Sequence, residues 1–192
     1  RAMQEQRDKA RASWAGSGEE TIKSVYKEIA GAAGKPVFTG YDILQDNGQI
    51  RAMVKGDLSV AELHEGDEAE ILLDRTPFYA ESGGQVGDRG DLLGEAAKFT
   101  VDATVKPHGD IIVHKGTLKK GVLKVGDTVL ARVDETGRGD TARHHTATHL
   151  LHATLRYVLG DHVKQAGSLV SPDRLRFDFT HYTALTDREL GR

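Results

Sequence analysis

The sequence predicts a mixed α+β fold in three consecutive parts: a helical linker over residues 1–32, a small β-barrel over 33–134 and an α+β module over 135–192. Three observations lead to this prediction. Apolar residues recur among charged ones in a helical pattern at the start, short β-branched runs separated by turn residues follow, and a histidine-rich helical pattern comes last. The two changes in sequence pattern mark the expected boundaries between the three parts.

Composition is typical of a soluble globular protein, with 38% hydrophobic and 29% charged residues among 192. The 26 basic and 29 acidic residues give a net charge of −3, so the chain carries no general nucleic-acid signature and any RNA contact would be local. The absence of cysteine excludes disulfides and fits a cytoplasmic protein. We find no signal peptide and no apolar run of about 18 residues, so no membrane association is expected.

The first 29 residues have the composition of a connecting helix, interrupted by the Gly-Ser-Gly break at Gly16–Gly18. The apolar positions of this pattern are Met3, Ala10, Trp14, Ile22, Val25 and Ile29. Because the chain begins with Arg1 rather than methionine, we expect it to be part of a longer polypeptide.

From Pro36 to Asp134, short β-branched runs alternate with turn residues, which favours a small β-barrel. The predicted turns include Asp46-Asn47-Gly48, Glu65-Gly66-Asp67, Asp88-Arg89-Gly90 and Val125-Gly126-Asp127. Two segments read alike, Leu63–Asp67 and Leu123–Asp127, because in each a Gly-Asp turn leads into a strand. We interpret them as two similar barrel turns rather than as a duplication.

Within the barrel region, the segment from Arg75 to Asp88 places a carboxylate, a hydroxyl and an amide around Gly83-Gly84. Consecutive glycines let a backbone approach another group closely, so this segment is a candidate binding loop. A barrel turn that contains a strained glycine pair explains it as well. It is not a phosphate-binding loop, because it lacks the lysine and the spacing of one.

The clearest helix is predicted over residues 141–159, ended by Gly160. We expect its core-facing side to carry Ala147, Leu150, Leu151, Leu155 and Val158. The opposite side is expected to carry His145, His149, His152 and Arg156.

Two strands are predicted after this helix, around Ser168–Val170 and over Leu175–Phe179. Thr186-Asp187-Arg188-Glu189 then forms a capping-box pattern, which indicates the start of another helix. Since a single turn does not offset its own nucleation cost, we expect that helix to continue in residues beyond Arg192.

His145 and His149 are four residues apart on a helix, a spacing at which two imidazoles can bind one metal ion such as zinc. Ordinary surface histidines remain the alternative. No glutamate follows His145 directly, so the metalloprotease pattern is absent. Downstream, the amide of Gln165 and the hydroxyl of Ser168 could face the same pocket, or belong to a plain helix-to-strand connection.

The segments Thr76–Gln85, His145–His152, Gln165–Val170 and Leu175–Phe179 closely resemble the editing region of the alanyl-tRNA synthetases, and the resemblance covers nearly the whole chain. It implies a barrel like the second domain of elongation factor Tu. It also implies an editing domain related to that of threonyl-tRNA synthetase, of which residues 135–192 would be the N-terminal part.

By this resemblance, His145 and His149 would be the first two of four zinc ligands, and Thr148 and Gln165 would line the editing pocket. The other two ligands belong to a Cys-x-x-x-His element that this sequence lacks, so we expect weak or no zinc binding by this chain alone.

The implied activity is hydrolysis of seryl or glycyl groups wrongly attached to tRNA(Ala), in an enzyme that also attaches alanine to tRNA(Ala) with ATP. We expect no ATP binding and no hydrolysis by this piece alone. Two alternatives remain, a free-standing deacylase of mischarged alanine tRNA and a non-enzymatic barrel that positions tRNA. The linker-like helix at the start disfavours the free-standing protein.

Overall fold

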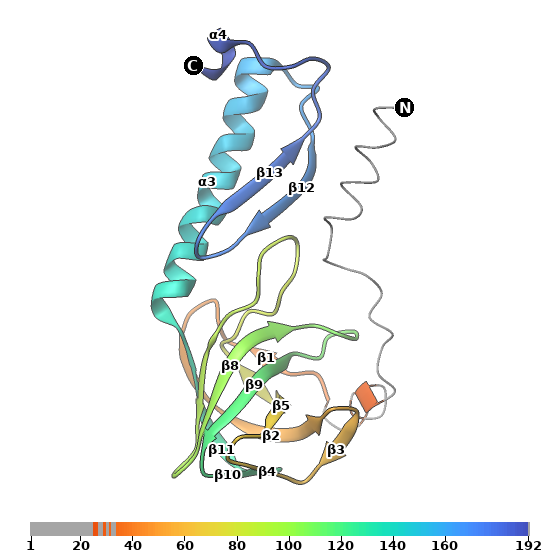
Figure 1. Cartoon of the computed structure of the whole chain (residues 1–192), viewed down its shortest axis with the longest axis vertical. Helices are drawn as coiled ribbons and strands as arrows, with labels where there is room; N and C mark the ends of the chain where they lie inside the picture. Colours follow the sequence, from red (N-terminus) through yellow and green to blue (C-terminus); the bar gives the residue numbers. More distant parts are fainter. Residues whose placement is uncertain (1–24, 27–28, 30, 32–33, 192) are drawn as a thin grey trace.

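A closed β-barrel forms one end of the molecule in the computed structural model, which describes residues 25–26, 29, 31 and 34–191 (Figure 1). The barrel region contains β1 (Val37–Phe38), β2 (Gln45–Lys55), β3 (Leu58–Val60), β4 (Glu62–His64), β5 (Glu68–Leu73), β6 (Arg75–Thr76), β7 (Gly90–Leu93), β8 (Lys98–Val105), β9 (Val113–Lys120), β10 (Val122–Lys124) and β11 (Thr128–Val133). Six of these strands are paired in the order β11-β7-β8-β9-β5-β2, and pairing of β2 with β11 closes the ring. The predicted small barrel is therefore confirmed.

The barrel interior is filled by side chains from alternate strand positions, as the period of two requires. Along β8, for example, Phe99 and Val101 are buried while the neighbouring Lys98 is exposed. The largest fully buried apolar side chains are Phe78, Phe99, Ile50, Met53, Leu63, Ile71, Leu92, Leu118 and Leu123. Each contributes about 1.5–3 kcal/mol by its removal from water, so the barrel has a core of its own.

A second apolar cluster involves the few described residues of the predicted linker. Val25, Tyr26 and Ile29 are helical and buried. They belong to the same cluster as Val54 and Val113 of the barrel strands. The rest of the helix predicted over residues 1–29 lies outside the described residues, so that prediction is untested there.

The two similar Gly-Asp segments form matching turns. In the first, the Asp67 carboxylate accepts the backbone N–H of His64 at 2.9 Å. In the second, the Asp127 carboxylate accepts the backbone N–H of Lys124 at 2.8 Å. The short strands β4 and β10 that precede these turns pair with each other. The sequence likeness thus reflects two equivalent barrel turns, each closed by an aspartate side chain.

The turn predicted at Asp46-Asn47-Gly48 is wrong, because these residues lie within β2 and pair with β11. Gly48 is needed there for packing. A Cβ atom at this position would lie 2.5 Å from the carbonyl oxygen of Arg75. A glycine inside a strand often marks such a close approach of two backbones. Asp88-Arg89-Gly90 also forms no turn, and its last residue begins β7.

Helix α3 (Glu135–Leu159) leaves the barrel directly after β11 and carries the second part of the fold. It begins six residues before the predicted helix, because the Asp134 side chain accepts the N–H of Thr136 at 3.1 Å and caps its first turn. Its end at Gly160 agrees with the prediction. No helix in the described part of the chain is long and apolar enough to cross a membrane.

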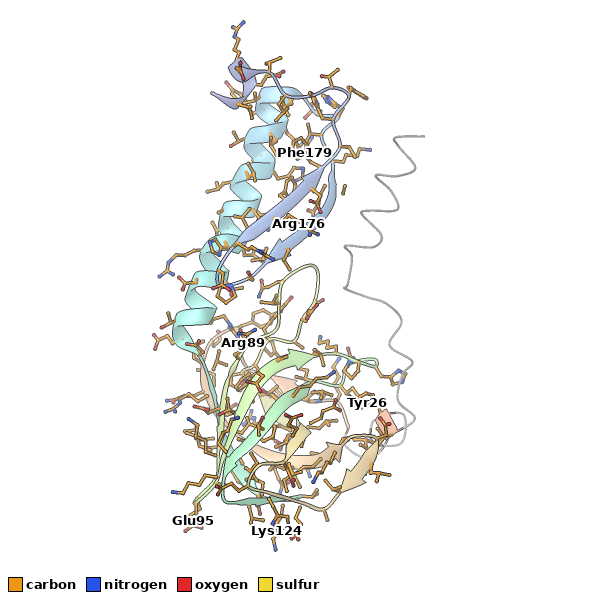
Figure 2. The ribbon with its side chains drawn as sticks, viewed as in Figure 1. Tyr26, Arg89, Glu95, Lys124, Arg176 and Phe179 are labelled. Carbon is orange, nitrogen blue, oxygen red and sulfur yellow. The ribbon has the colours of Figure 1, made fainter. Side chains whose placement is uncertain are left out.

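Strands β12 (Gln165–Val170) and β13 (Leu175–Phe179) form an antiparallel hairpin beside α3, which confirms both predicted strands. The short helix α4 (Asp187–Leu190) follows, and both hydrogen bonds of the predicted capping box at Thr186 and Glu189 are present. Figure 2 shows Arg176 and Phe179 on this hairpin, and Glu95 and Lys124 at the opposite end of the molecule, on the barrel.

The predicted core face of α3 is wrong at Leu150 and Leu151, which are 65% and 38% exposed. The other three residues of that face, Ala147, Leu155 and Val158, are half-buried. The hairpin packs on the histidine-bearing side of the helix, where the rings of His152 and Phe177 lie with centroids 5.0 Å apart and planes tilted by 41°. An amphipathic pattern identifies an apolar side but not the side on which a partner element packs, and the two differ in this helix.

The exposure of Leu150 leads to a prediction about stability. Because glutamine and leucine have similar helix propensities and the side chain is exposed, Leu150→Gln is expected to change the free energy of unfolding by less than about 0.5 kcal/mol. The matched variant Val163→Ala, at a position only 1% exposed in the same part of the fold, is expected to cost about 2 kcal/mol. Urea unfolding of the 192-residue chain measures both. A larger cost for the leucine variant would contradict the exposed position.

Candidate functional site

A pocket lies where the barrel meets the hairpin module, and residues from both parts line it. The barrel contributes a loop between β6 and β7, and the second module contributes α3, β12 and β13. The lining residues are Gly83, Gln85, His145, Thr148, His149, His152, Gln165, Ser168, Val170 and Phe177. All four residues singled out for the site from the sequence, which are His145, Thr148, His149 and Gln165, are therefore brought together.

The two histidines of the predicted metal site face each other on α3. Their Nε2 atoms are 3.1 Å apart and both side chains are exposed to the pocket mouth. The Nδ1 atom of His145 lies 2.9 Å from the amide oxygen of Gln85. Since an amide oxygen only accepts hydrogen bonds, we assign the proton of neutral His145 to Nδ1. Its Nε2 lone pair is then directed toward His149.

Gln85 reaches this position because its loop pairs with the second module. The N–H of Val86 donates to the carbonyl of Val170 at 3.0 Å, and the N–H of Val170 donates to the carbonyl of Gly84 at 2.8 Å. In Figure 1 the same yellow-green loop rises from the barrel toward the hairpin. The segment is therefore a barrel loop that also forms one wall of the pocket.

Gly84 permits this approach in two ways. Its φ of 84° lies in the left-handed region that favours glycine. A Cβ atom on Gly84 would also lie 2.6 Å from both the carbonyl oxygen and the hydroxyl oxygen of Ser168. Gly84 thus lets the loop backbone lie against β12, so the close approach expected from the sequence is made to the hairpin.

Thr148 and Gln165 present oxygen and nitrogen atoms to the pocket. The hydroxyl of Thr148 donates to the carbonyl of His144 at 2.8 Å, so its oxygen lone pairs remain available as acceptors. The amide nitrogen of Gln165 donates to the hydroxyl of Ser168 at 3.1 Å. Ser168 therefore accepts one bond within the wall of the pocket and keeps its own proton for another partner.

The hydroxyl of Ser168 lies in the pocket, which is one of the two alternatives that the sequence left open. Two other polar lining residues were not singled out from the sequence. One is Gln85, because nothing in the sequence joins it to a histidine 60 residues away. The other is His152, whose Nε2 atom is buried without a hydrogen-bond partner in the described part of the chain. A buried polar atom without a partner, in the wall of a pocket, is a candidate contact for a bound molecule.

The histidine pair fits half of a zinc site. Two ligand atoms about 2.0–2.1 Å from a tetrahedral zinc lie roughly 3.3 Å apart, close to the 3.1 Å between the Nε2 atoms of His145 and His149. The bond to Gln85 also orients His145 as an outer partner of a metal ligand does. Among the described residues, no group of three or more His, Cys, Asp or Glu side chains is placed to hold a metal.

A comparison with family models assigns the chain to a class of tRNA synthetases. The model for class II (A) tRNA synthetases matches residues 1–137, which comprise the barrel and the first turn of α3. Because this match covers well over half of the chain, the protein belongs to the class II (A) tRNA synthetase family. Gly83 and Gln85 lie inside the matched region, whereas the histidine pair follows it.

Individual relatives narrow the likeness to one kind of synthetase. The chain is 49% identical over its whole length to an alanine--tRNA ligase of Rhodopseudomonas palustris. It is 51% identical over 99% of its length to one of Halorhodospira halophila, and 47% identical over its whole length to one of Bradyrhizobium diazoefficiens. The chain spans only 21–22% of the length of these relatives. The predicted resemblance to alanyl-tRNA synthetases is therefore confirmed, and the chain matches a part of these larger enzymes.

Proposed function

We propose that the chain is part of an alanine--tRNA ligase and contributes to an editing site that hydrolyses mischarged seryl- and glycyl-tRNA(Ala). The observation that carries the proposal is the composite pocket, which gathers Gln85, His145, Thr148, His149 and Gln165 from two parts of the fold. The likeness to alanine--tRNA ligases supplies the substrate class. In the intact enzyme, attachment of alanine with ATP would take place in other residues.

The reaction requires attack of water on the ester carbonyl, followed by cleavage of the bond to the tRNA ribose oxygen. Products are the free amino acid and tRNA with its terminal hydroxyl restored. His145 and His149 would hold a zinc ion, together with ligands from elsewhere in the enzyme. When bound, zinc supplies a Lewis acid that can polarise a carbonyl or lower the pKa of a water molecule. The contribution of Gln85 is to hold His145 in the tautomer that leaves Nε2 free.

Thr148 is our candidate for the residue that separates serine from alanine. Because its own proton is given to the carbonyl of His144, its hydroxyl oxygen can accept the hydroxyl proton of a seryl group. An alanyl group offers no such proton and would leave this acceptor unpaired. Sites built around a substrate hydroxyl discriminate against analogues that lack it for this reason. A glycyl group also lacks the hydroxyl, so this bond accounts for the choice between serine and alanine and not for hydrolysis of the glycyl ester.

Gln165 and Ser168 are placed to order water or the carbonyl oxygen. None of the hydrogen bonds among the described residues uses the amide oxygen of Gln165, and Ser168 retains its hydroxyl proton. Together they offer one acceptor and one donor from the same strand. A fixed donor aimed at the developing oxyanion contributes more than water does, because it needs no reorganisation.

The partner of the intact protein is proposed to be tRNA(Ala), in the cytoplasm, with no membrane contact. The balanced charge of the chain, −3 overall, fits local contact with the tRNA end rather than a broad basic surface.

Hydrolysis of mischarged tRNA tests the proposal. We expect full-length enzyme to release serine from seryl-tRNA(Ala) and to leave alanyl-tRNA(Ala) intact. The 192-residue chain alone is expected to be inactive, since two imidazoles complete half of a four-ligand site, and extension by about 100 residues of the gene to include further ligands should restore turnover. Turnover by the short chain would contradict the incomplete metal site. Absence of hydrolysis in the full-length enzyme would contradict editing and favour a barrel that only positions tRNA.

A further inference from the structure

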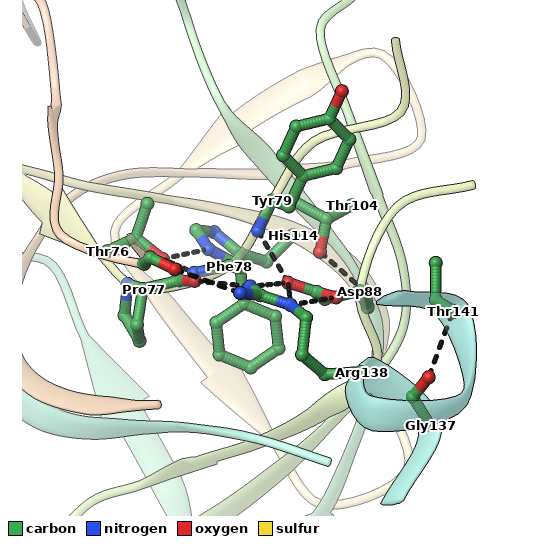
Figure 3. A network of polar contacts seen from close by, with 11 residues as sticks. Thr76, Pro77, Phe78, Tyr79, Asp88, Thr104, His114, Gly137, Arg138 and Thr141 are labelled. Carbon is green, nitrogen blue, oxygen red and sulfur yellow. Dashed lines mark hydrogen bonds and ion pairs between the residues drawn. The ribbon is translucent and has the colours of Figure 1, made fainter. Parts of the chain in front are cut away.

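Arg138, in the first turn of α3, binds three separate segments of the barrel, and Figure 3 shows its contacts with Pro77 and Asp88. Its Nε donates to the Asp88 carboxylate at 2.9 Å, and its Nη2 makes an ion pair with the same carboxylate. Nη1 donates to the carbonyl of Gly40 at 2.9 Å and Nη2 to the carbonyl of Pro77 at 3.0 Å. The guanidinium group is therefore a junction between the helix and the barrel.

Asp88, the partner of Arg138, closes the base of the loop that carries Gln85. Its carboxylate accepts the N–H of Tyr79 at 2.6 Å, and its own N–H donates to the carbonyl of Tyr79 at 2.9 Å. The hydroxyl of Thr104 on β8 donates to the Asp88 carbonyl at 2.8 Å. The Asp88 side chain is only 5% exposed, so water competes little for these bonds. The two ends of the loop, residues 77–79 and 88, are thus fixed to each other and to Arg138.

The same helix contacts this loop a second time. Arg138 and His145 are seven residues apart, which is about two helical turns, so both side chains lie on one face of α3. Arg138 binds the base of the loop at Pro77 and Asp88, and His145 binds Gln85 near its tip. Two points of attachment on one rigid helix set the position of the whole loop relative to the histidine pair.

From this arrangement we propose that Arg138 is a positioning residue of the composite pocket, which acts through Asp88 and the loop to hold Gln85 against His145. Its effect on catalysis rests on the proposed function, whereas its effect on the tautomer of His145 does not. Only a planar, forked group can serve the carboxylate and two carbonyls at once, so lysine would keep the charge but lose the geometry.

Imidazole NMR of the chelator-treated 192-residue chain at pH 8 tests the positioning directly. In Arg138→Lys, the signal of the Nδ1–H tautomer of His145 is expected to weaken. Its position should shift toward that of the His145 signal in Gln85→Ala, a variant that lacks the amide oxygen to which Nδ1–H donates. Arg132→Lys is the matched control, because Arg132 also pairs with an aspartate, Asp91, but is half exposed on β11. That variant should retain the wild-type His145 signal. An unchanged His145 signal in Arg138→Lys, or in Gln85→Ala, would overturn the inference.

Hydrolysis of seryl-tRNA(Ala) by the full-length enzyme provides the second measurement. Arg138→Lys is expected to lower kcat by about 10- to 100-fold with little change in KM, as loss of an outer partner of a metal ligand does. Arg132→Lys should hydrolyse at the wild-type rate. If the wild-type enzyme does not hydrolyse seryl-tRNA(Ala) but the His145 signal still changes in Arg138→Lys, the editing function is wrong. The positioning role of Arg138 is then still supported. A full rate in Arg138→Lys, despite a shifted His145 signal, would overturn the catalytic part of the inference.

Discussion

Replacing His149 with asparagine is expected to lower hydrolysis of seryl-tRNA(Ala) by the full-length enzyme about a thousandfold and to abolish stoichiometric zinc binding. The Nε2 atom of His149 lies 3.1 Å from that of His145, and the asparagine side chain cannot place a nitrogen lone pair there. A metal that polarises a carbonyl or a water contributes several kcal/mol to the transition state, and about 1.4 kcal/mol corresponds to a factor of ten. Zinc content by metal analysis and single-turnover deacylation measure the two effects.

The matched control for this prediction is His64→Asn, the same chemical change at an exposed position on β4, where the ring lies 3.2 Å from Glu62. It should retain both zinc and hydrolysis. Alanine attachment, which we place elsewhere in the enzyme, should survive in both variants and report an intact fold. Normal zinc content in His149→Asn would refute the histidine pair as ligands, and loss of zinc with unchanged hydrolysis would restrict the metal to a structural role.

The histidine pair could be predicted from the sequence because its geometry is local. Residues four apart on a helix are neighbours in any fold, and α3 forms as expected around His145 and His149. The hydrogen bond that orients His145 was not predictable in this way. Gln85 is 60 residues away, and its approach depends on the pairing of the Gly84 loop with Val170. A single sequence contains no local signal for that pairing.

Two of the corrected features have a common physical origin. Asp46-Asn47-Gly48 has the composition of a turn, but β11 is available as a partner and the segment pairs with it as a strand. Leu150 and Leu151 have the spacing of a core face, but the hairpin packs on the other side of α3. In both cases the tertiary partner decided between conformations or faces that the local pattern left nearly equivalent.

The barrel turns at Glu65–Asp67 and Val125–Asp127 were predictable for the opposite reason, because their conformation is specified locally. The carboxylates of Asp67 and Asp127 each accept the backbone N–H of the residue three positions earlier, and both turns lead into strands as expected. What the local pattern does not supply is the order of the strands, in which β11 lies between β2 and β7. The junction at Arg138 also escaped prediction, because its partners Gly40 and Pro77 are 98 and 61 residues away.

One buried group inside the barrel should make the stability of the protein depend on pH. His114 is completely buried beside Phe78, whose ring centroid is 5.1 Å away. Its Nδ1 lies 2.9 Å from the carbonyl of Ile71, so Nδ1 carries the proton and donates. Nε2, at 2.8 Å from the hydroxyl of Thr76, then accepts. Both ring nitrogens thus have hydrogen-bond partners in the neutral form.

Burial lowers the pKa of His114 from 6.5 to about 4, and the hydrogen bond to the Ile71 carbonyl opposes this shift only in part. The unfolded chain therefore binds a proton at this histidine as the pH falls below 6.5, whereas the folded chain does so only near pH 4. Between these values the unfolded state holds more protons, so stability decreases as the pH falls. The full difference is about 3 kcal/mol, and about 2 kcal/mol of it is lost by pH 5.

Urea unfolding of the 192-residue chain at pH 7.5 and pH 5 is expected to show this loss in the wild type and not in His114→Asn. Asparagine removes the titrating group while its amide can still donate to Ile71, so the variant should be less stable at pH 7.5 but should lose about 2 kcal/mol less on acidification. Thr76→Val is the matched control: it removes the hydroxyl partner but leaves the imidazole buried, and since burial is the larger cause of the shift, its pH dependence should remain. Equal losses in the wild type and in His114→Asn would show that other groups govern the acid stability of the barrel.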